Sequence, residues 1–206
     1  MLLWTVVIPV KRLAVAKSRL ADPARNRDLA LAFAQDTVRA AATAAGVARV
    51  LVVTGDDEVA RAVAGSGAVV RPDVLIGGLN AALRSAAAYA VATWGPHAVA
   101  AVPSDLPALS ADQLEAALTA AVGSQRAFVA DADGGGTTLL SATDGALDAH
   151  YGPGSARAHA RSGATSLDGD WPGLRRDVDT MEDLWSACAL GVGQHTEALL
   201  ARAVFI

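Results

Sequence analysis

Short apolar runs rich in β-branched residues alternate with longer alanine-rich stretches, and this alternation limits the fold more than any other feature. The runs expected to form strands lie at residues 2–10, 50–54, 68–71, 98–102 and 127–130. They show no alternation of apolar and polar residues, which is typical of strands buried on both faces of a sheet. The alanine-rich stretches between them have helical spacing. The sequence therefore predicts an α/β fold with a mostly parallel sheet covered by helices.

The second half of the chain is less regular. Helices are expected at residues 27–45, 57–64, 78–94, 110–122, from 155 onward and at 180–190, where Thr180 is the expected N-cap. After residue 130 the sequence predicts a turn at 131–136 and strands at 137–142 and 175–178. Because no linker, repeat or charge block interrupts the chain, residues 1–206 are expected to form a single domain.

Composition excludes several classes of protein. The 206 residues are 52% hydrophobic, too apolar for intrinsic disorder, and the net charge of −4 argues against a nucleic-acid binder. Cys188 is the only cysteine, so a disulfide framework is excluded, and its surroundings predict a buried thiol. The sequence has neither an apolar run of membrane-spanning length nor a signal-peptide pattern. We therefore expect a cytoplasmic protein that does not enter a membrane.

Basic residues gather directly after the first predicted strand. Lys11, Arg12, Lys17 and Arg19 are four of the 17 basic residues and fall within nine positions. Ligands of open parallel sheets bind beyond the carboxyl ends of the strands, where these side chains could clamp a phosphate. The sequence contains neither a GxGxxG nor a Walker pattern, so such a site would rely on side chains. A solvated basic loop is the alternative interpretation.

Two glycines and an asparagine follow the third predicted strand. Gly77 and Gly78 begin the expected helix, where their lack of a side chain permits a ligand to approach the backbone closely. The amide of Asn80 offers both donors and an acceptor, which suits a base edge or a ribose. The same residues also fit an ordinary helix start.

Three carboxylates follow predicted strands. Asp105 lies between two prolines at the end of the fourth strand, and as a hard oxygen ligand it could hold Mg²⁺. Asp177 and Asp179 would face the same way in an extended segment. A turn aspartate and a helix cap are the respective alternatives. Asp131 and Asp133 have the same spacing but precede three glycines, which favours a turn.

Two further loops could hold an anion. Thr137 follows the glycines, and the loop from Gly152 to Ser155 opens a short helix whose first amides and hydroxyl could bind an anion. A glycine-proline turn with an N-cap is the alternative. The four histidines lack metal-ligand spacing, and the sequence has neither a nucleophile elbow nor an HExxH motif. A zinc enzyme or a covalent hydrolase is therefore not expected.

Read together, these motifs resemble the phosphoenolpyruvate/2-phospho-L-lactate guanylyltransferases of coenzyme F-420 biosynthesis. The matching pieces are Lys17-Ser18-Arg19-Leu20, Gly78-Leu79-Asn80, Ser104-Asp105-Leu106-Pro107, Gly136-Thr137-Thr138, Tyr151-Gly152-Pro153-Gly154-Ser155 and Asp177-Val178-Asp179. The first and fifth are the most specific, whereas the third is shared widely among nucleotidyltransferases. The resemblance implies a three-layer, Rossmann-like nucleotide-diphospho-sugar transferase (GT-A-like) fold, which agrees with the alternation of strands and helices.

The resemblance also implies a reaction in which GTP and phosphoenolpyruvate give enolpyruvyl-2-diphospho-5′-guanosine and pyrophosphate. Its implied site residues are Asp105, Asp177 and Asp179 for Mg²⁺, Thr137, Gly152 and Ser155 for phosphoenolpyruvate, and Lys11, Lys17, Arg19, Gly78 and Asn80 for the nucleotide. Lys17 and Asp105 are the residues expected to act in catalysis. A general base is unnecessary, because a phosphate monoester is already ionised near neutral pH. The expected partners are the two substrates and a downstream transferase of the same pathway, and a homodimer is left open.

The sequence also allows other acceptors and other functions. The acceptor could be 2-phospho-L-lactate or 3-phosphoglycerate, and phosphoenolpyruvate is favoured because the composition is typical of high-GC actinobacteria. A molybdopterin guanylyltransferase-like enzyme is expected to have a glycine-rich first loop, which this sequence lacks. A non-catalytic nucleotide-binding domain would not need three carboxylates around one site.

Overall fold

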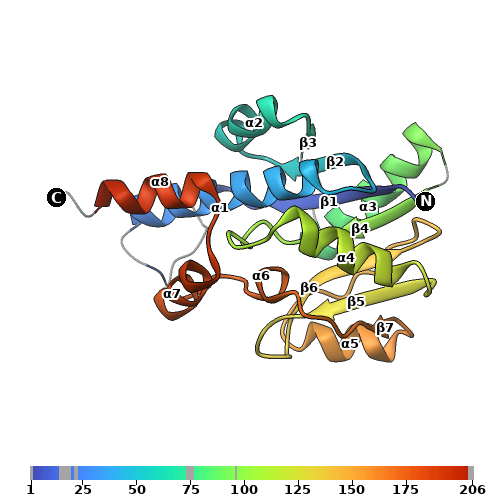
Figure 1. Ribbon diagram of the computed structural model, residues 1–206. Coiled ribbons are helices and arrows are strands. Elements are labelled where there is room, and N and C mark those ends of the chain that lie inside the picture. Colours follow the sequence, from blue (N-terminus) through green and yellow to red (C-terminus); the bar gives the residue numbers. More distant parts are fainter. Residues whose placement is uncertain (1, 14–19, 21–22, 73–76, 96, 204–206) are drawn as a thin grey trace.

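The described strands form a single mixed sheet (Figure 1). The computed structural model describes residues 2–13, 20, 23–72, 77–95 and 97–203. The strand order is β3-β2-β1-β4-β6-β5-β7. The strands are β1 (Trp4–Val10), β2 (Val47–Thr54), β3 (Val69–Pro72), β4 (Ala98–Ala101), β5 (Arg126–Ala130), β6 (Thr137–Ala142) and β7 (Thr165–Ser166). This order places the first strand in the interior of the sheet.

Helices cover both faces of this sheet, as the sequence predicts. The helices are α1 (Pro23–Thr43), α2 (Asp57–Val63), the 3₁₀ turn η2 (Ala64–Ser66), α3 (Gly78–Trp94), α4 (Ala111–Ala121), α5 (Ser155–Arg161), α6 (Pro172–Arg175), α7 (Met181–Leu190) and α8 (Gln194–Ala203). One core lies between the sheet and α1, α2, α4 and α6, and a second lies between the sheet and α3 and α5. The predicted three-layer α/β fold is therefore confirmed.

The central strand β1 supplies both cores. Val6 and Ile8 pack toward α1 and α4, Val7 packs toward α3, and all three are fully buried. Burying a side chain of this size contributes about 1.5–3 kcal/mol. Because both faces of the strand are covered, neither set of alternate residues can be polar, which explains the continuous apolar run.

The direction of β6 positions part of the site. Strands β1 to β4 are parallel, but β6 runs antiparallel to both β4 and β5. The register pairs Ala101 with Leu140, so Thr137 at the start of β6 lies at the sheet edge where β4 ends. The carboxyl ends of β1 and β4 and the amino end of β6 therefore share one edge.

The predicted strand at 175–178 is wrong. Residues 172–175 form the short helix α6, which begins with a proline and is held by Gln113 of α4. The Gln113 side-chain oxygen accepts hydrogen bonds from the backbone nitrogens of Gly173, at 2.8 Å, and Leu174, at 3.1 Å. The edge strand is instead β7, parallel to β5. These contacts join segments far apart in the sequence, so a local apolar run could not predict them.

The C-terminal helices also differ in part from expectation. Helix α8, which the sequence analysis did not predict, lies along α1 (Figure 1). Helix α7 begins at the predicted cap Thr180, but Cys188 on it is exposed rather than buried. A third apolar cluster includes Phe33 of α1, Leu184 of α7 and Val178, which is fully buried. Among the described helices, none is both long and apolar enough to cross a membrane.

Candidate functional site

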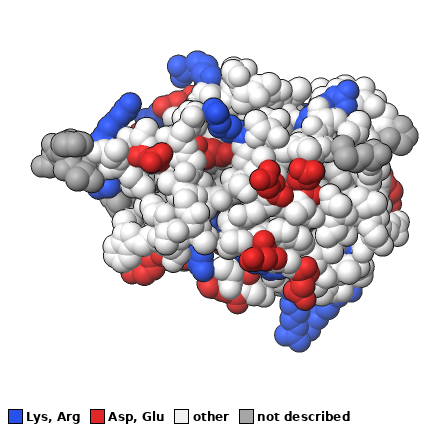
Figure 2. All heavy atoms as spheres, in the orientation of Figure 1, with Lys and Arg blue, Asp and Glu red and all other residues white. Residues whose placement is uncertain are grey.

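A cavity of about 270 Å³ opens at the carboxyl edge of the sheet. It is lined by Pro9, Val10, Lys11, Leu13, Ala30, Leu79, Pro103, Ser104, Asp105 and Asp179. These residues come from the ends of β1 and β4, from α1, from the start of α3 and from the segment before α7. The cavity brings the basic Lys11 together with two carboxylates, at the edge where the sequence predicts a ligand. Acidic and basic side chains both occur on the face of the molecule that Figure 2 shows.

Backbone contacts hold the two acidic segments together. The backbone nitrogen of Val178 donates to the carbonyl oxygen of Asp105 at 3.1 Å, and the Val178 side chain is fully buried. The side chain of Asp183 accepts from the backbone nitrogens of Asp179 and Thr180, at 3.2 and 2.9 Å. Asp177 and Asp179 therefore flank an anchored residue beside Asp105, whose Oδ1 atom is buried.

The neighbouring carboxylates affect the pKa of Asp177. Burial, followed by the negative charges of Asp105, Asp131 and Asp179, raises the pKa of Asp177 to about 7. The sequence predicts a turn at Asp131, and the Asp131 side chain does accept hydrogen bonds from the backbone nitrogens of Gly135 and Gly136, at 2.9 and 2.6 Å. That turn also adds a negative charge to the site, because it follows the carboxyl end of β5, which runs in the same direction as β4.

The four carboxylates fit an open metal site better than a closed one. Within the described residues, no group of three or more Asp, Glu, His or Cys side chains is arranged to hold a metal ion. Mg²⁺ often binds through one or two carboxylates and takes its other ligands from water and substrate phosphates. Hard anionic oxygens that repel one another suit a divalent cation of this kind. The donor chemistry therefore fits a metal whose coordination is completed by the substrates.

The basic loop is only partly described. Lys11 and Arg12 are exposed, and the backbone nitrogen of Leu13 donates at 2.9 Å to Asp56, which caps α2. This hydrogen bond is the main reason that the pKa of Asp56 is lowered. Lys17 and Arg19 lie outside the described residues. The structure thus anchors the start of the loop beside the cavity.

The start of α3 has geometry that requires glycine. Gly78 has a φ of +73°, and a Cβ on Gly77 would lie 2.8 Å from the Cβ of Ala81. Asn80 holds the main chain of Tyr151, since its Nδ2 donates to the Tyr151 oxygen at 2.9 Å and its Oδ1 accepts from the Tyr151 nitrogen at 2.7 Å. This contact, which the sequence analysis missed, links the helix to the loop at 151–154.

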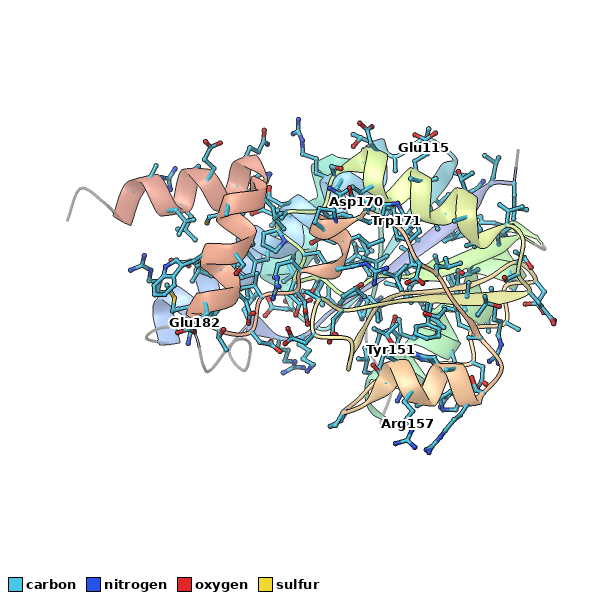
Figure 3. All side chains as sticks on the ribbon, turned by 60° about the horizontal axis from the view of Figure 1, so that its bottom comes forward. Glu115, Tyr151, Arg157, Asp170, Trp171 and Glu182 are labelled. Atoms are coloured by element: carbon cyan, nitrogen blue, oxygen red, sulfur yellow. The ribbon has the colours of Figure 1, made fainter. Side chains whose placement is uncertain are left out.

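The predicted acceptor residues are brought together between β6 and α5. The hydroxyls of Thr137 and Ser155 are 3.1 Å apart, and both side chains are buried. Gly152 has a φ of +143°, which favours glycine, and its oxygen accepts from the Ser155 nitrogen at 3.1 Å. Figure 3 shows Tyr151 between α5 and the sheet, whereas Arg157 points outward. The inner face of α5 therefore holds Ser155 against Thr137.

His159 joins this pair, and the sequence analysis assigned it no role. Its Nδ1 lies 2.9 Å from the Thr137 hydroxyl, and its Nε2 accepts from the backbone nitrogen of His150 at 3.0 Å. Burial lowers the pKa of His159 to about 4. The signal that could have found it is spacing, because Ser155 and His159 are four residues apart and share a helix face.

The sequence matches known proteins over nearly its whole length. A family model described as "Guanylyl transferase CofC like" matches residues 4–205. A Geodermatophilus obscurus protein named phosphoenolpyruvate guanylyltransferase is 50% identical over 208 residues, which cover 97% of this chain and 95% of the relative.

Solved structures show the same fold at low identity. A putative nucleotide-diphospho-sugar transferase from Desulfovibrio desulfuricans G20 has a TM-score of 0.64 and 18% identity, covering 92% of this chain and 97% of its own. A Mycobacterium tuberculosis H37Rv protein in complex with manganese has a TM-score of 0.51 and 21% identity, covering 91% and 98%. The chain therefore has the fold of nucleotide-diphospho-sugar transferases.

Proposed function

Because the chain belongs to the family of CofC-like guanylyl transferases, we propose that it transfers GMP from GTP to phosphoenolpyruvate. A phosphate oxygen of phosphoenolpyruvate forms a bond to the α-phosphorus of GTP. The bond from that phosphorus to the oxygen bridging to the β-phosphate breaks, and pyrophosphate leaves. The products are enolpyruvyl-2-diphospho-5′-guanosine and pyrophosphate.

The observation that carries this proposal is the shared cavity of Lys11, Asp105 and Asp179. Both substrates are polyanions, so the main task of the site is to bring like charges together. A cavity that offers a cationic side chain and carboxylates able to hold a cation meets this need from two sides. A site that only binds a nucleotide would not need three carboxylates.

We assign the nucleotide to the β1 and α3 side of the cavity. Lys11 would neutralise the GTP phosphates together with Lys17 and Arg19, and Lys17 would stabilise the charge that develops on the leaving pyrophosphate. The glycine-opened start of α3, with Gly78 and Asn80, would face the guanosine. Because Asn80 also bonds to Tyr151, a nucleotide seated there would contact the helix that supports the loop at residues 151–154, here called the acceptor loop.

We assign the acceptor to Thr137, Gly152 and Ser155. Hydroxyl and backbone N–H groups are suitable donors for a carboxylate or a phosphate. A general base is not required, since the attacking phosphate oxygen is already ionised. The site residues have only to orient it in line with the leaving group.

We propose Mg²⁺ as the cofactor, held by one or two of the carboxylates of Asp105, Asp177 and Asp179 together with the substrates. The ion would supply charge neutralisation at the reacting phosphates. The manganese in the related Mycobacterium tuberculosis structure supports use of a divalent cation. We further expect the protein to act in the cytoplasm and to pass its product to a transferase of coenzyme F-420 biosynthesis. A homodimer stays a prediction.

The proposal is tested by measuring pyrophosphate release from GTP and Mg²⁺. Phosphoenolpyruvate, 2-phospho-L-lactate and 3-phosphoglycerate are offered one at a time, beside a reaction without acceptor. We expect the highest kcat/KM with phosphoenolpyruvate and negligible release without acceptor. Release that does not depend on an acceptor, or none with any of the three, would contradict guanylyl transfer to a phospho-acid.

A further inference from the structure

Three buried polar side chains form a chain of hydrogen bonds behind the acceptor loop. His159 Nδ1 lies 2.9 Å from Thr137 Oγ1, which lies 3.1 Å from Ser155 Oγ. His159 is fully buried, and Thr137 and Ser155 are 7% and 3% exposed. The Tyr151 ring packs edge-on against the imidazole, with 5.2 Å between ring centroids. The imidazole is thus held in a fixed orientation.

A backbone contact determines which ring nitrogen carries the proton. The His150 backbone N–H donates to His159 Nε2 at 3.0 Å, and a backbone nitrogen can only donate. Nε2 must therefore present its lone pair. A neutral imidazole then carries its hydrogen on Nδ1, which makes Nδ1 the donor to Thr137.

The imidazole is neutral because of its surroundings. Burial lowers the pKa of His159 to about 4, with further lowering by His150 and Arg126 and an opposing effect of Asp148. At neutral pH only the tautomer remains to be decided, and the His150 contact decides it.

The tautomer controls what the two hydroxyls can offer to a ligand. Thr137 and Ser155 together have two hydroxyl hydrogens, and the bond between them uses one. If Nδ1 donates, the other hydrogen stays available, whichever hydroxyl carries it. If Nδ1 were instead an acceptor, it would take that hydrogen, and the pair would show only lone pairs to an incoming anion.

We propose that His159 is a positioning residue whose Nδ1–H makes the Thr137–Ser155 pair a hydrogen-bond donor to the anionic acceptor substrate. The proposal rests on the proposed function in so far as the acceptor binds at these two hydroxyls. His159 itself does not touch the substrate. Its contribution is to make the pair selective for groups that accept hydrogen bonds, such as a carboxylate or a phosphate.

The tautomer is tested without any substrate by ¹⁵N NMR of histidine-labelled protein. We expect the imidazole signal that disappears in His159→Gln to show a protonated Nδ1 and an unprotonated Nε2 at pH 7, unchanged on acidification to about pH 5.5. Protonation of Nε2, or titration near the ordinary histidine pKa of about 6.5, would overturn the proposal.

Two substitutions of His159 distinguish the loss of its hydrogen-bond donor from the loss of its ring, by their effects on KM. The amide nitrogen of His159→Asn replaces Nδ1 as a donor, whereas His159→Gln reaches the Nε2 position and leaves Thr137 without its donor. We expect His159→Gln to raise KM for phosphoenolpyruvate by about 10- to 100-fold, the size of a lost hydrogen bond to a charged group. His159→Asn should raise it by no more than about threefold, and KM for GTP should change little in either.

Controls keep the two proposals distinct. His195→Asn on α8 is the matched histidine control and should leave KM for both substrates unchanged, and thermal unfolding shows whether each variant is folded. An equal KM for phosphoenolpyruvate in folded His159→Asn and His159→Gln would overturn the role of His159. Should either variant not fold, the NMR measurement on the unmodified protein decides. An inactive unmodified protein would instead contradict the proposed function, and the NMR result would still decide the tautomer.

Discussion

At the scale of single residues, the site is dominated by like charges held close together. Burial and three neighbouring carboxylates raise the pKa of Asp177 to about 7, an arrangement that opposes folding in the absence of a cation. Charge repulsion that lowers the stability of the folded chain is retained in proteins where function requires it. The sequence predicts Asp105 at the carboxyl edge of the sheet because it follows a predicted strand, and it predicts Asp177 and Asp179 there although the strand expected at 175–178 does not form. Asp131 also follows a predicted strand, but the three glycines after it favour a turn, so its charge is not expected at the site.

Asp105→Asn is expected to lower kcat by about 100-fold or more, because it removes a carboxylate proposed to hold the metal at the reacting phosphates. The measurement is pyrophosphate release at saturating GTP and phosphoenolpyruvate. Asp170→Asn, in the exposed loop before α6, is the matched control. Near-normal turnover of Asp105→Asn would remove this residue from the metal site.

Asp177→Asn should have opposite effects on activity and stability. Removing a charge that burial and its neighbours disfavour should raise the free energy of unfolding of the metal-free protein by about 1 kcal/mol, while activity falls. Urea denaturation at pH 8 with a chelator measures this difference. A less stable variant would show that the carboxylates do not repel one another in the folded chain.

His159 predicts how stability depends on acidity. Its pKa is lowered to about 4, so between pH 6.5 and pH 4 the unfolded chain binds a proton that the folded chain does not. Stability from this group is therefore complete above about pH 6.5 and is lost as the pH falls.

The expected loss between pH 7 and pH 5 is about 1–2 kcal/mol more in the unmodified protein than in His159→Asn. Urea denaturation at the two pH values provides the comparison. His150, Asp148 and Arg126 face the ring and remain in both proteins, so their titration largely cancels. Parallel pH curves for the two proteins would contradict a neutral, buried imidazole.

At the scale of elements, segments with clear apolar periodicity could be predicted, and those fixed by distant contacts could not. Strand β4 and helix α3 follow their local patterns, and α3 spans the predicted residues. The segment 172–175 became a helix through its contacts with Gln113, which lies some sixty residues earlier in the chain. Helix α8 depends on Asp36 of α1 in the same way.

Asp36→Ala should release the start of α8. The buried Asp36 side chain accepts from the backbone nitrogens of His195 and Thr196, at 3.0 and 2.9 Å. Losing a charged cap of this kind should lower the free energy of unfolding by about 2 kcal/mol, measured by urea denaturation. Asp28→Ala, at an exposed position of the same helix, is the control. Equal stability of the two variants would show that α8 does not depend on this cap.

At the scale of the whole molecule, the topology brings residues from separate segments of the sequence to one edge of the sheet. One sheet edge carries the ends of β1 and β4, the start of β6 and the segment before α7, with Lys11, Asp105, Thr137 and Asp179 on it. The strand-end rule for parallel sheets predicted this edge. The rule could not predict the hydrogen bonds of Asn80 with the main chain of Tyr151 or of His159 with the side chain of Thr137, because these bonds join separate elements of the fold.

This edge of the sheet is where we propose that GMP is transferred from GTP to phosphoenolpyruvate. The most direct test of this transfer is mass spectrometry of the products formed from GTP, Mg²⁺ and phosphoenolpyruvate, 2-phospho-L-lactate and 3-phosphoglycerate in equal amounts. We predict that enolpyruvyl-2-diphospho-5′-guanosine is the main guanylylated product, with an equivalent amount of pyrophosphate. A main product derived from either other acceptor, or unconverted GTP, would contradict the account.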